Sequence, residues 1–160
     1  MESPANRRKA DDSYQHSTEC RRSFLLKGSQ VNTLYSYLMV FLGAGLGGML
    51  RHSVNLVSPR VFGLDLPIGT LLINLTGSLL LGMAAGLFAS RGHASHQVQL
   101  FLATGVLGGF TTFSAFSLEA ALLWQRGQVV SCALYALASV VLAILAVFGG
   151  LAMVRMHPAV

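Results

Sequence analysis

The sequence predicts an all-α membrane protein with four transmembrane helices, and three observations support this fold class. The chain is 53% hydrophobic and only 11% charged, whereas about 25% of the residues in soluble domains are charged. The charges are uneven, because residues 1–30 hold ten of the seventeen Asp, Glu, Lys and Arg residues. The rest of the chain contains four apolar runs, each near the ~20 residues that a helix needs to cross the hydrocarbon core.

Residues 1–34 are polar and basic, and we expect them to form a disordered tail. Basic residues that flank a first span are more often cytoplasmic anchors than nucleic-acid contacts, and no folded basic face accompanies them. Residues 20–27 also resemble a twin-arginine export signal, but no clear cleavage site follows them. We therefore favour a basic tail beside a first span and expect no nucleic-acid partner.

The four apolar runs comprise residues 35–57, 67–89, 98–122 and 129–154. Breakers and charges occupy the links between them, and no run shows the alternation of a strand. Residues 35–155 therefore form one four-span domain, which we place in the cell membrane as a multi-pass protein. Glycines four residues apart occur in three of the runs, and such pairs let helix backbones approach closely. They are Gly43 and Gly47, Gly82 and Gly86, and Gly105 and Gly109.

Three of the polar residues inside these runs carry a charge or an amide that is costly there without a partner, namely Arg51, Glu119 and Asn74. Arg51 lies in the second half of the first run and Glu119 late in the third, so snorkelling to an interface could account for both. Asn74 lies in the middle of the second run, where its amide needs a partner. That partner is either a neighbouring helix or a wet pathway.

The third run contains a glycine pair followed by hydroxyl-bearing residues, namely Gly108, Gly109, Thr111, Thr112 and Ser114. We expect the third helix to break at the glycine pair, beside an ion pathway, because non-helical backbone at membrane depth needs protein or water around it. Phe113 and Phe116 lie on one helix face, and the edges of their rings are electropositive. Nothing in the sequence suggests an enzyme, since the histidines and the two cysteines are scattered without ligand or triad spacing.

Three segments together resemble the CrcB/Fluc family of fluoride channels, namely GGMLR at 47–51, GTLLINLTGS at 69–78, and residues 105–119 with TTFS at their centre. The resemblance extends from about residue 35 to 155. It implies an antiparallel, dual-topology homodimer with two pores that export fluoride passively from the cytoplasm. It also implies one central structural sodium ion, which is not transported.

The resemblance also implies roles for particular residues. Sodium would be bound by the backbone carbonyls of Gly108 and Thr111 from both subunits. Fluoride would meet a set of pathway residues consisting of Asn74, Phe113, Phe116, Ser114, Tyr135, Ser139, Arg51 and Glu119. A row of weak donors and ring edges can replace the water around fluoride without trapping the ion.

Two features depart from this family pattern. Ala115 replaces the usual threonine, so one hydroxyl of the pathway is missing. The basic residues near the membrane also favour one orientation, with both termini in the cytoplasm, whereas an antiparallel homodimer needs both orientations. A paralogous second subunit therefore stays open. The main alternative is a small four-span multidrug or cation transporter, but such a carrier needs a carboxylate in the first span, and residues 35–57 contain none.

Overall fold

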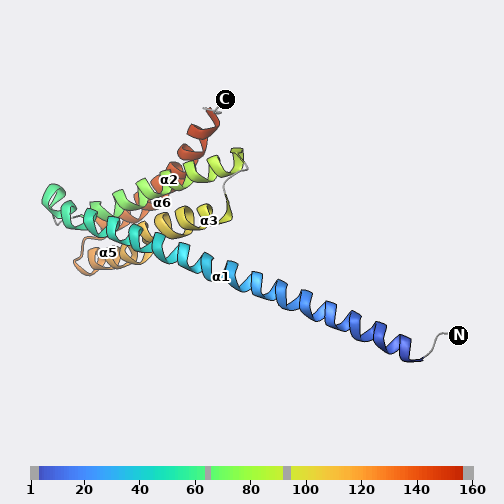
Figure 1. The fold of residues 1–160 in the computed structure, drawn as a ribbon. Coiled ribbons are helices and arrows are strands. Elements are labelled where there is room, and N and C mark those ends of the chain that lie inside the picture. Colours follow the sequence, from blue (N-terminus) through green and yellow to red (C-terminus); the bar gives the residue numbers. More distant parts are fainter. Residues whose placement is uncertain (1–3, 64–65, 92–94, 157–160) are drawn as a thin grey trace. The chain divides into compact units, whose positions relative to one another are not determined.

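A computed structural model describes residues 4–63, 66–91 and 95–156 of the chain, with side chains described from Thr33 onward except at Arg91 (Figure 1). The chain consists of two compact units, Met1–Leu38 and Met39–Val160. The predicted tail, residues 1–34, falls almost entirely in the part of the first helix whose side chains are not described, and its disorder stays a prediction. The features below belong to the second unit.

The described residues are helical in all of the predicted spans. The long helices are α1 (Pro4–Phe62), α2 (Ile68–Arg91) and α6 (Val129–Met156). The third span consists of α3 (His96–Gln99), the π-helix η1 (Leu100–Leu107), α4 (Gly108–Phe110) and α5 (Phe113–Gln125). Four segments are long and apolar enough to cross a membrane: Thr33–Phe62, Ile68–Ser90, His96–Gln125 and Val129–Met156. The prediction of an all-α protein with four spans is therefore confirmed.

The helix ends follow from glycines with a positive φ angle. Gly63, at φ 80°, follows α1, and its N–H donates to the Pro59 carbonyl. Helix α1 extends beyond the predicted span 35–57, because Pro59 lies within its last turn and the helix continues to Phe62. Gly127, at φ 74°, ends α5 by donating to the Trp124 carbonyl, while the next N–H donates to Leu123. This is the Schellman arrangement, which needs the left-handed conformation that glycine adopts without strain.

Five of the six spaced glycines lie where helix backbones touch, as predicted, whereas Gly86 faces the side chain of Val154. A Cβ atom on Gly43 would lie 2.9 Å from the Gly105 Cα, so α1 and η1 are in direct backbone contact. On the other side of the bundle, a Cβ on Gly82 would overlap the backbone of Val147 in α6. Helices α2 and α6 lie side by side over most of their length (Figure 1). Any side chain larger than hydrogen would separate these pairs.

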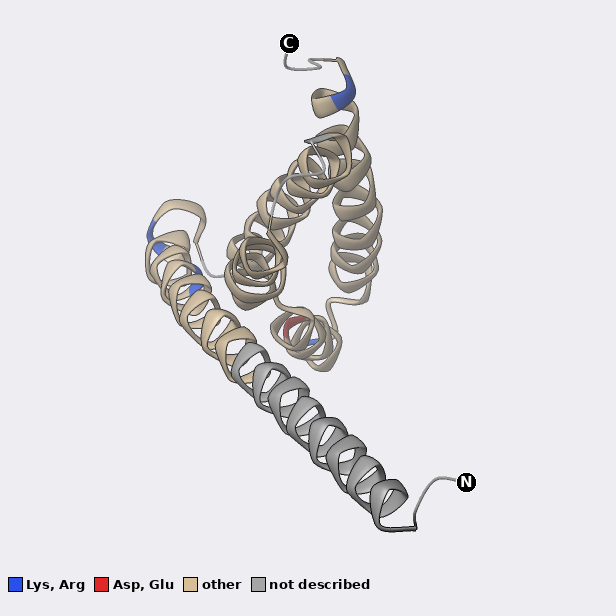
Figure 2. Ribbon diagram, turned by 45° about the vertical axis from the view of Figure 1, so that its right-hand side comes forward, with Lys and Arg blue, Asp and Glu red and all other residues tan. Residues whose placement is uncertain are grey.

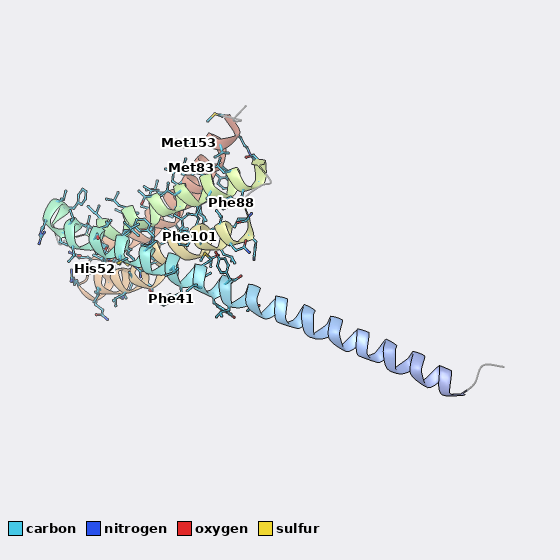
Figure 3. The ribbon with its side chains drawn as sticks, viewed as in Figure 1. Phe41, His52, Met83, Phe88, Phe101 and Met153 are labelled. Carbon is cyan, nitrogen blue, oxygen red and sulfur yellow. The ribbon has the colours of Figure 1, made fainter. Side chains whose placement is uncertain are left out.

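The described helices direct apolar side chains outward and polar ones inward. Large apolar residues such as Phe41, Leu137 and Phe148 are exposed, and side chains project from the outer sides of the helices in Figure 3. Apart from glycines, the few buried residues among those described are as often polar as apolar, and the buried polar ones are Ser58, Thr70, Thr112 and Ser139. This distribution fits a protein whose solvent is hydrocarbon and whose polar groups must find partners inside.

Candidate ion pathway

The third span leaves the helical conformation at two consecutive residues. Thr111 has φ −76° and ψ 156°, and Thr112 has φ −152° and ψ 122°, which is extended backbone in both cases. The break expected at Gly108-Gly109 is wrong in position, because both glycines belong to α4. Their small size serves packing instead, since a Cβ on Gly109 would lie 2.6 Å from the Ala44 carbonyl oxygen of α1.

One side chain of α2 holds this extended segment. The Asn74 Nδ2 donates to the Thr112 carbonyl at 2.9 Å, and the Thr112 N–H donates to the Asn74 Oδ1 at 2.8 Å. The amide thus satisfies both backbone groups of Thr112, as a neighbouring strand would. In a regular α-helix the Thr112 N–H would donate to the Gly108 carbonyl. Asn74 takes that N–H, so the Gly108 carbonyl is relieved of its helical partner.

The hydroxyl of Thr112 then starts the next helix. It accepts the N–H of Ala115 at 3.2 Å, which is the bond of an N-cap residue. The same hydroxyl lies 3.2 Å from the Ser114 Oγ. Ala115, where the family pattern has a hydroxyl, therefore contributes its backbone N–H to the cap. The TTFS motif therefore begins a helix in the middle of the span His96–Gln125. Asn74 bonds the backbone of Thr112 before this helix, and the Thr112 hydroxyl caps its first turn.

Two residues at the break, Gly108 and Thr111, are in different surroundings. Gly108 is exposed in this chain, and within the described residues a Cβ there would meet only the Ala103 carbonyl oxygen, at 3.6 Å. The Thr111 carbonyl lies 3.4 Å from the Arg51 Nη1, in a long charge-assisted contact. Arg51 is half-buried, and its guanidinium reaches the break in the third span.

A second polar cluster lies around Glu119 and joins three helices. The Glu119 Oε1 accepts from the Thr70 hydroxyl of α2 at 2.7 Å, and its Oε2 accepts from the Tyr135 hydroxyl of α6 at 2.8 Å. Glu119 is therefore paired by two hydroxyls. Thr70, which is 2% exposed, was not among the residues predicted for the pathway. The sequence could have indicated Thr70, because it lies one turn before Asn74 and residues i and i+4 share a helix face.

Aromatic rings connect the cluster to the break. The ring centroids of Phe113 and Phe116 are 5.3 Å apart, and those of Phe116 and Tyr135 are 5.4 Å apart. The ring planes are inclined to each other by 47° in the first pair and 42° in the second, so neither pair is stacked face to face. Phe113 is 76% exposed although it lies in the middle of the span.

Two open cavities lie along these residues. One, of about 340 Å³, has Asn74, Thr112, Phe113, Phe116 and Ser139 among its lining residues. The Ser139 Oγ is buried and has no hydrogen-bond partner within the part of the chain that the structure describes. The other cavity, of about 270 Å³, is lined by Thr70, Glu119 and Arg126 among others. Thr70 and Asn74, one turn apart on α2, thus line one cavity each.

The structure therefore brings together most of the residues predicted for the ion pathway. Helix α2 provides Asn74, α6 provides Tyr135 and Ser139, and Arg51 of α1 lies beside the Thr111 carbonyl. The remaining residues belong to α5 and are Phe113, Ser114, Phe116 and Glu119. Their roles toward an ion stay predictions. Among the described residues, no group of three or more His, Cys, Asp or Glu side chains could hold a metal ion.

The fold and this site define a class of protein: a small four-span membrane protein with a polar track of hydroxyls, amide and aromatic edges through its interior. The family model described as "CrcB-like protein, Camphor Resistance (CrcB)" matches residues 38–151, and the chain belongs to this family. It is a multi-pass protein of the cell membrane. The resemblance stated from the sequence is confirmed.

Relatives of known name support the same assignment. The chain is 55% identical over 120 residues to the fluoride-specific ion channel FluC 2 of Nitrobacter hamburgensis. The aligned residues are 75% of this chain and 97% of the relative. It is 58% identical, with the same coverage, to the fluoride-specific ion channel FluC of Rhodopseudomonas palustris strain BisB5. The FluC channel of Granulibacter bethesdensis is 52% identical over 122 residues, 76% of this chain and 96% of its own length. These are names of ion channels and not of enzymes.

Proposed function

We propose that this chain is the subunit of a fluoride-selective channel that lets fluoride leave the cytoplasm passively. The observation that carries the proposal is the lining of the larger cavity. Its lining residues include Asn74, whose amide has a second N–H, Phe113, Phe116 and Ser139, whose buried hydroxyl has no hydrogen-bond partner among the described residues. Family membership and the printed names of the relatives support fluoride as the ion.

The chemistry of this lining suits a small, strongly hydrated anion. Removing water from fluoride is costly unless several donors replace the water at once. Hydroxyls, an amide N–H and electropositive ring edges are weak donors, so they can substitute for water and still release the ion. No Lys or Arg is among the residues that line the larger cavity, and a fixed cation there would bind fluoride too tightly for conduction.

We further propose that two subunits of this fold associate in antiparallel orientation and form two pores. Phe113 is 76% exposed and Gly108 is exposed at the break, yet both lie at the middle of a membrane span. Open polar backbone facing lipid would cost several kcal/mol per group by the order-of-magnitude estimate for unsatisfied groups in hydrocarbon. A second subunit over this face would shield the break and complete the wall of the cavity.

The same break is the place for the structural sodium ion. The donor set fits the ion, because Asn74 takes the N–H that would otherwise occupy the Gly108 carbonyl, and the extended conformation turns the Thr111 carbonyl out of the helix. Two carbonyls from each subunit would provide oxygen ligands of the kind that hard cations prefer. When bound, sodium would join the two subunits through these oxygens. Thr111 would keep its contact with Arg51 through the second lone pair of its carbonyl.

A four-span cation or multidrug transporter is the competing function. Such a carrier binds and releases protons at a carboxylate within its first span, whereas Thr33–Phe62 contains no Asp or Glu. The one carboxylate within the described spans, Glu119, lies on α5 and is paired with Thr70 and Tyr135. These contacts favour a fixed structural acceptor.

The experiment is fluoride efflux from liposomes that contain the purified chain, read with a fluoride electrode. Liposomes are loaded with potassium fluoride, and a potassium ionophore is added so that charge does not limit release. We expect fast fluoride release, with no release from chloride-loaded liposomes beyond the protein-free control. Fluoride release equal to that of protein-free liposomes would refute the proposal, and proton-coupled uptake of an organic cation would favour the transporter.

A further inference from the structure

The smaller of the two cavities, of about 270 Å³, lies where three helix ends meet. Helix α1 ends at Phe62, α2 begins at Ile68 and α5 ends at Gln125. The lining residues come from the last two turns of α1, the link to α2, the first turn of α2 and the last two turns of α5. Because these helix ends are also the ends of membrane spans, the cavity lies at the membrane-surface end of the polar track.

One face of α5 forms a wall of this cavity. The lining residues on α5 are Glu119, Leu122, Leu123 and Arg126, and their spacing of three, four and seven places them on one helix face. Arg126 follows Glu119 by seven residues, which is about 10 Å along the helix axis. The wall therefore has the polar cluster around Glu119 at its inner end and Arg126 at its surface end.

Arg126 supplies the positive charge of the cavity. It is the only Lys or Arg among the lining residues, in a described ribbon that carries few charged residues (Figure 2). Its side chain is exposed, and no hydrogen bond or ion pair joins it to another residue that the structure describes. The lining carboxylate, Glu119, accepts hydroxyls at both oxygens and keeps its negative charge. Without Arg126, an approaching anion would meet only that negative charge among the described lining residues.

Helices α1 and α2 add hydrogen-bond donors. Ser58 is 9% exposed and lines the cavity, yet no hydrogen bond joins its hydroxyl to another described residue. It lies against the first turn of α2, since a Cβ on Gly69 would be 2.7 Å from the Ser58 Oγ and 3.5 Å from the Asn55 Oδ1. Gly69 and Thr70 of that turn also line the cavity. The first N–H groups of a helix lack helical acceptors and form the positive end of its dipole.

The two helix ends of opposite sign are capped. At the end of α1, the Gly63 N–H donates to the Pro59 carbonyl. At the end of α5, backbone N–H groups occupy the carbonyls of Leu122, Leu123 and Trp124. These bonds satisfy last-turn carbonyls that would otherwise repel an anion. The positive start of α2 is therefore the helix end that acts most strongly on the cavity.

We propose that this cavity is a capture site for small inorganic anions, with Arg126 as its charge and Ser58 and the first turn of α2 as its donors. The inference rests on the proposed fluoride channel and places the site at the surface end of the same pathway. Capture is electrostatic and unselective, because an exposed guanidinium attracts any small anion within about 8 Å at physiological salt. Arg126 therefore raises the rate at which anions reach the polar cluster and leaves the choice of fluoride to the larger cavity.

The first test measures the potential in the cavity without using ion flux. Leu66, a lining residue that is 45% exposed, is replaced by cysteine in the full chain after Cys20→Ser and Cys132→Ala. The thiol is then modified by an anionic sulfonate-bearing and a cationic ammonium-bearing methanethiosulfonate reagent. Arg126→Gln should lower the ratio of the anionic to the cationic modification rate at least threefold, whereas Arg126→Lys should keep it.

Two controls separate Arg126 from other charges. Arg155→Gln removes the same charge in the last turn of α6, about 40 Å along that helix from its start, and should leave the ratio unchanged. Asp65 precedes Leu66 but lies outside the described residues, so the comparison is repeated in an Asp65→Asn background, where the effect of Arg126→Gln should persist. A ratio that ignores Arg126→Gln, or that Arg155→Gln lowers equally, would overturn the capture site.

The second test asks whether the site lies on the pathway, by comparing fluoride efflux from liposomes at two ionic strengths. Charges act over ~30 Å at ~0.01 M salt and over ~3 Å at ~1 M. Arg126→Gln should slow efflux at least threefold at the low ionic strength and should match the parent at the high one. Ser58→Ala should slow efflux at both, because salt does not screen the loss of a hydrogen-bond donor.

The two tests fail separately. If Arg126→Gln changes the reagent ratio but conducts like the parent at low ionic strength, the cavity lies off the pathway and the inference is wrong. An arginine that only anchors the helix end to lipid head groups would likewise show no salt-dependent difference in efflux. If the parent releases no fluoride, the proposed channel function fails, while the reagent ratio still decides whether the cavity attracts anions.

Discussion

Replacing Asn74 with leucine tests whether one amide holds the break in the third span. The substitution keeps a similar volume and removes both bonds to Thr112, of 2.9 and 2.8 Å. A typical hydrogen bond contributes ~0.5–1.5 kcal/mol net, and a buried group left without a partner costs ~1–3 kcal/mol. Thr112 is 8% exposed, so its N–H and C=O have little access to water. We expect a loss of about 2–6 kcal/mol from the free energy of unfolding, from two such groups.

The variant can recover part of this loss by forming a helical hydrogen bond across the break, but that bond would remove the proposed sodium site. The released Thr112 N–H can donate to the Gly108 carbonyl, as in a regular helix. The break would then close, and the carbonyl proposed for sodium would be occupied. Asn74→Leu should therefore abolish fluoride flux even where the protein still folds. Asn74→Asp keeps the acceptor for the Thr112 N–H but sets a carboxylate against the Thr112 carbonyl, so it should also lose flux.

The assay combines fluoride efflux with unfolding by SDS in mixed micelles. Trp124 is the single tryptophan of the chain and reports unfolding by its fluorescence. Thr76→Val is the matched control, since Thr76 lies on the same helix and its hydroxyl bonds only to carbonyls of that helix. We expect the control to change neither the unfolding midpoint nor the flux appreciably. If Asn74→Leu unfolds at the parental SDS concentration and conducts like the parent, the two bonds from Asn74 to Thr112 do not hold the break.

Further predictions concern the rings, the exposed glycine, the acidic cluster and sodium. Phe113→Ile and Phe116→Ile keep apolar bulk but remove the electropositive edges, so flux should fall at least tenfold in liposomes, and unchanged flux in both would make the pair ordinary packing. Gly108→Leu should reduce dimer and flux, whereas Gly45→Leu should reduce neither, and gel filtration and efflux compare them; within the described residues a Cβ on Gly45 meets no atom within 4 Å and one on Gly108 meets only the Ala103 carbonyl oxygen, at an ordinary 3.6 Å. Tyr135→Phe removes the 2.8 Å bond to Glu119 and should lower the free energy of unfolding by about 1 kcal/mol, measured by SDS titration. Replacing sodium with a large organic cation should shift the purified protein from dimer toward monomer, and a sodium-independent elution profile would contradict the proposed site.

The sequence was sufficient for the spans because their signal is local. Each run is apolar over the length of a bilayer, and glycines end α1 and α5 at the positions that their φ angles require. The spacing of Gly43, Gly82 and Gly105 likewise predicted backbone contacts, since only glycine allows two helices to touch at that distance. The polar residues of the pathway were recognised because each is costly inside a membrane unless it is used.

The tertiary structure decided which polar groups meet. The glycine pair was the expected place of the break, but the extended residues are Thr111 and Thr112, because Asn74 provides the bonds that replace those of a helix. That amide is 38 positions away in the chain, and Thr70 reaches Glu119 across 49. Hydropathy describes how each segment meets lipid, one residue at a time. Hydrogen-bond partners depend on which helix faces are packed together, and only the folded bundle sets that arrangement.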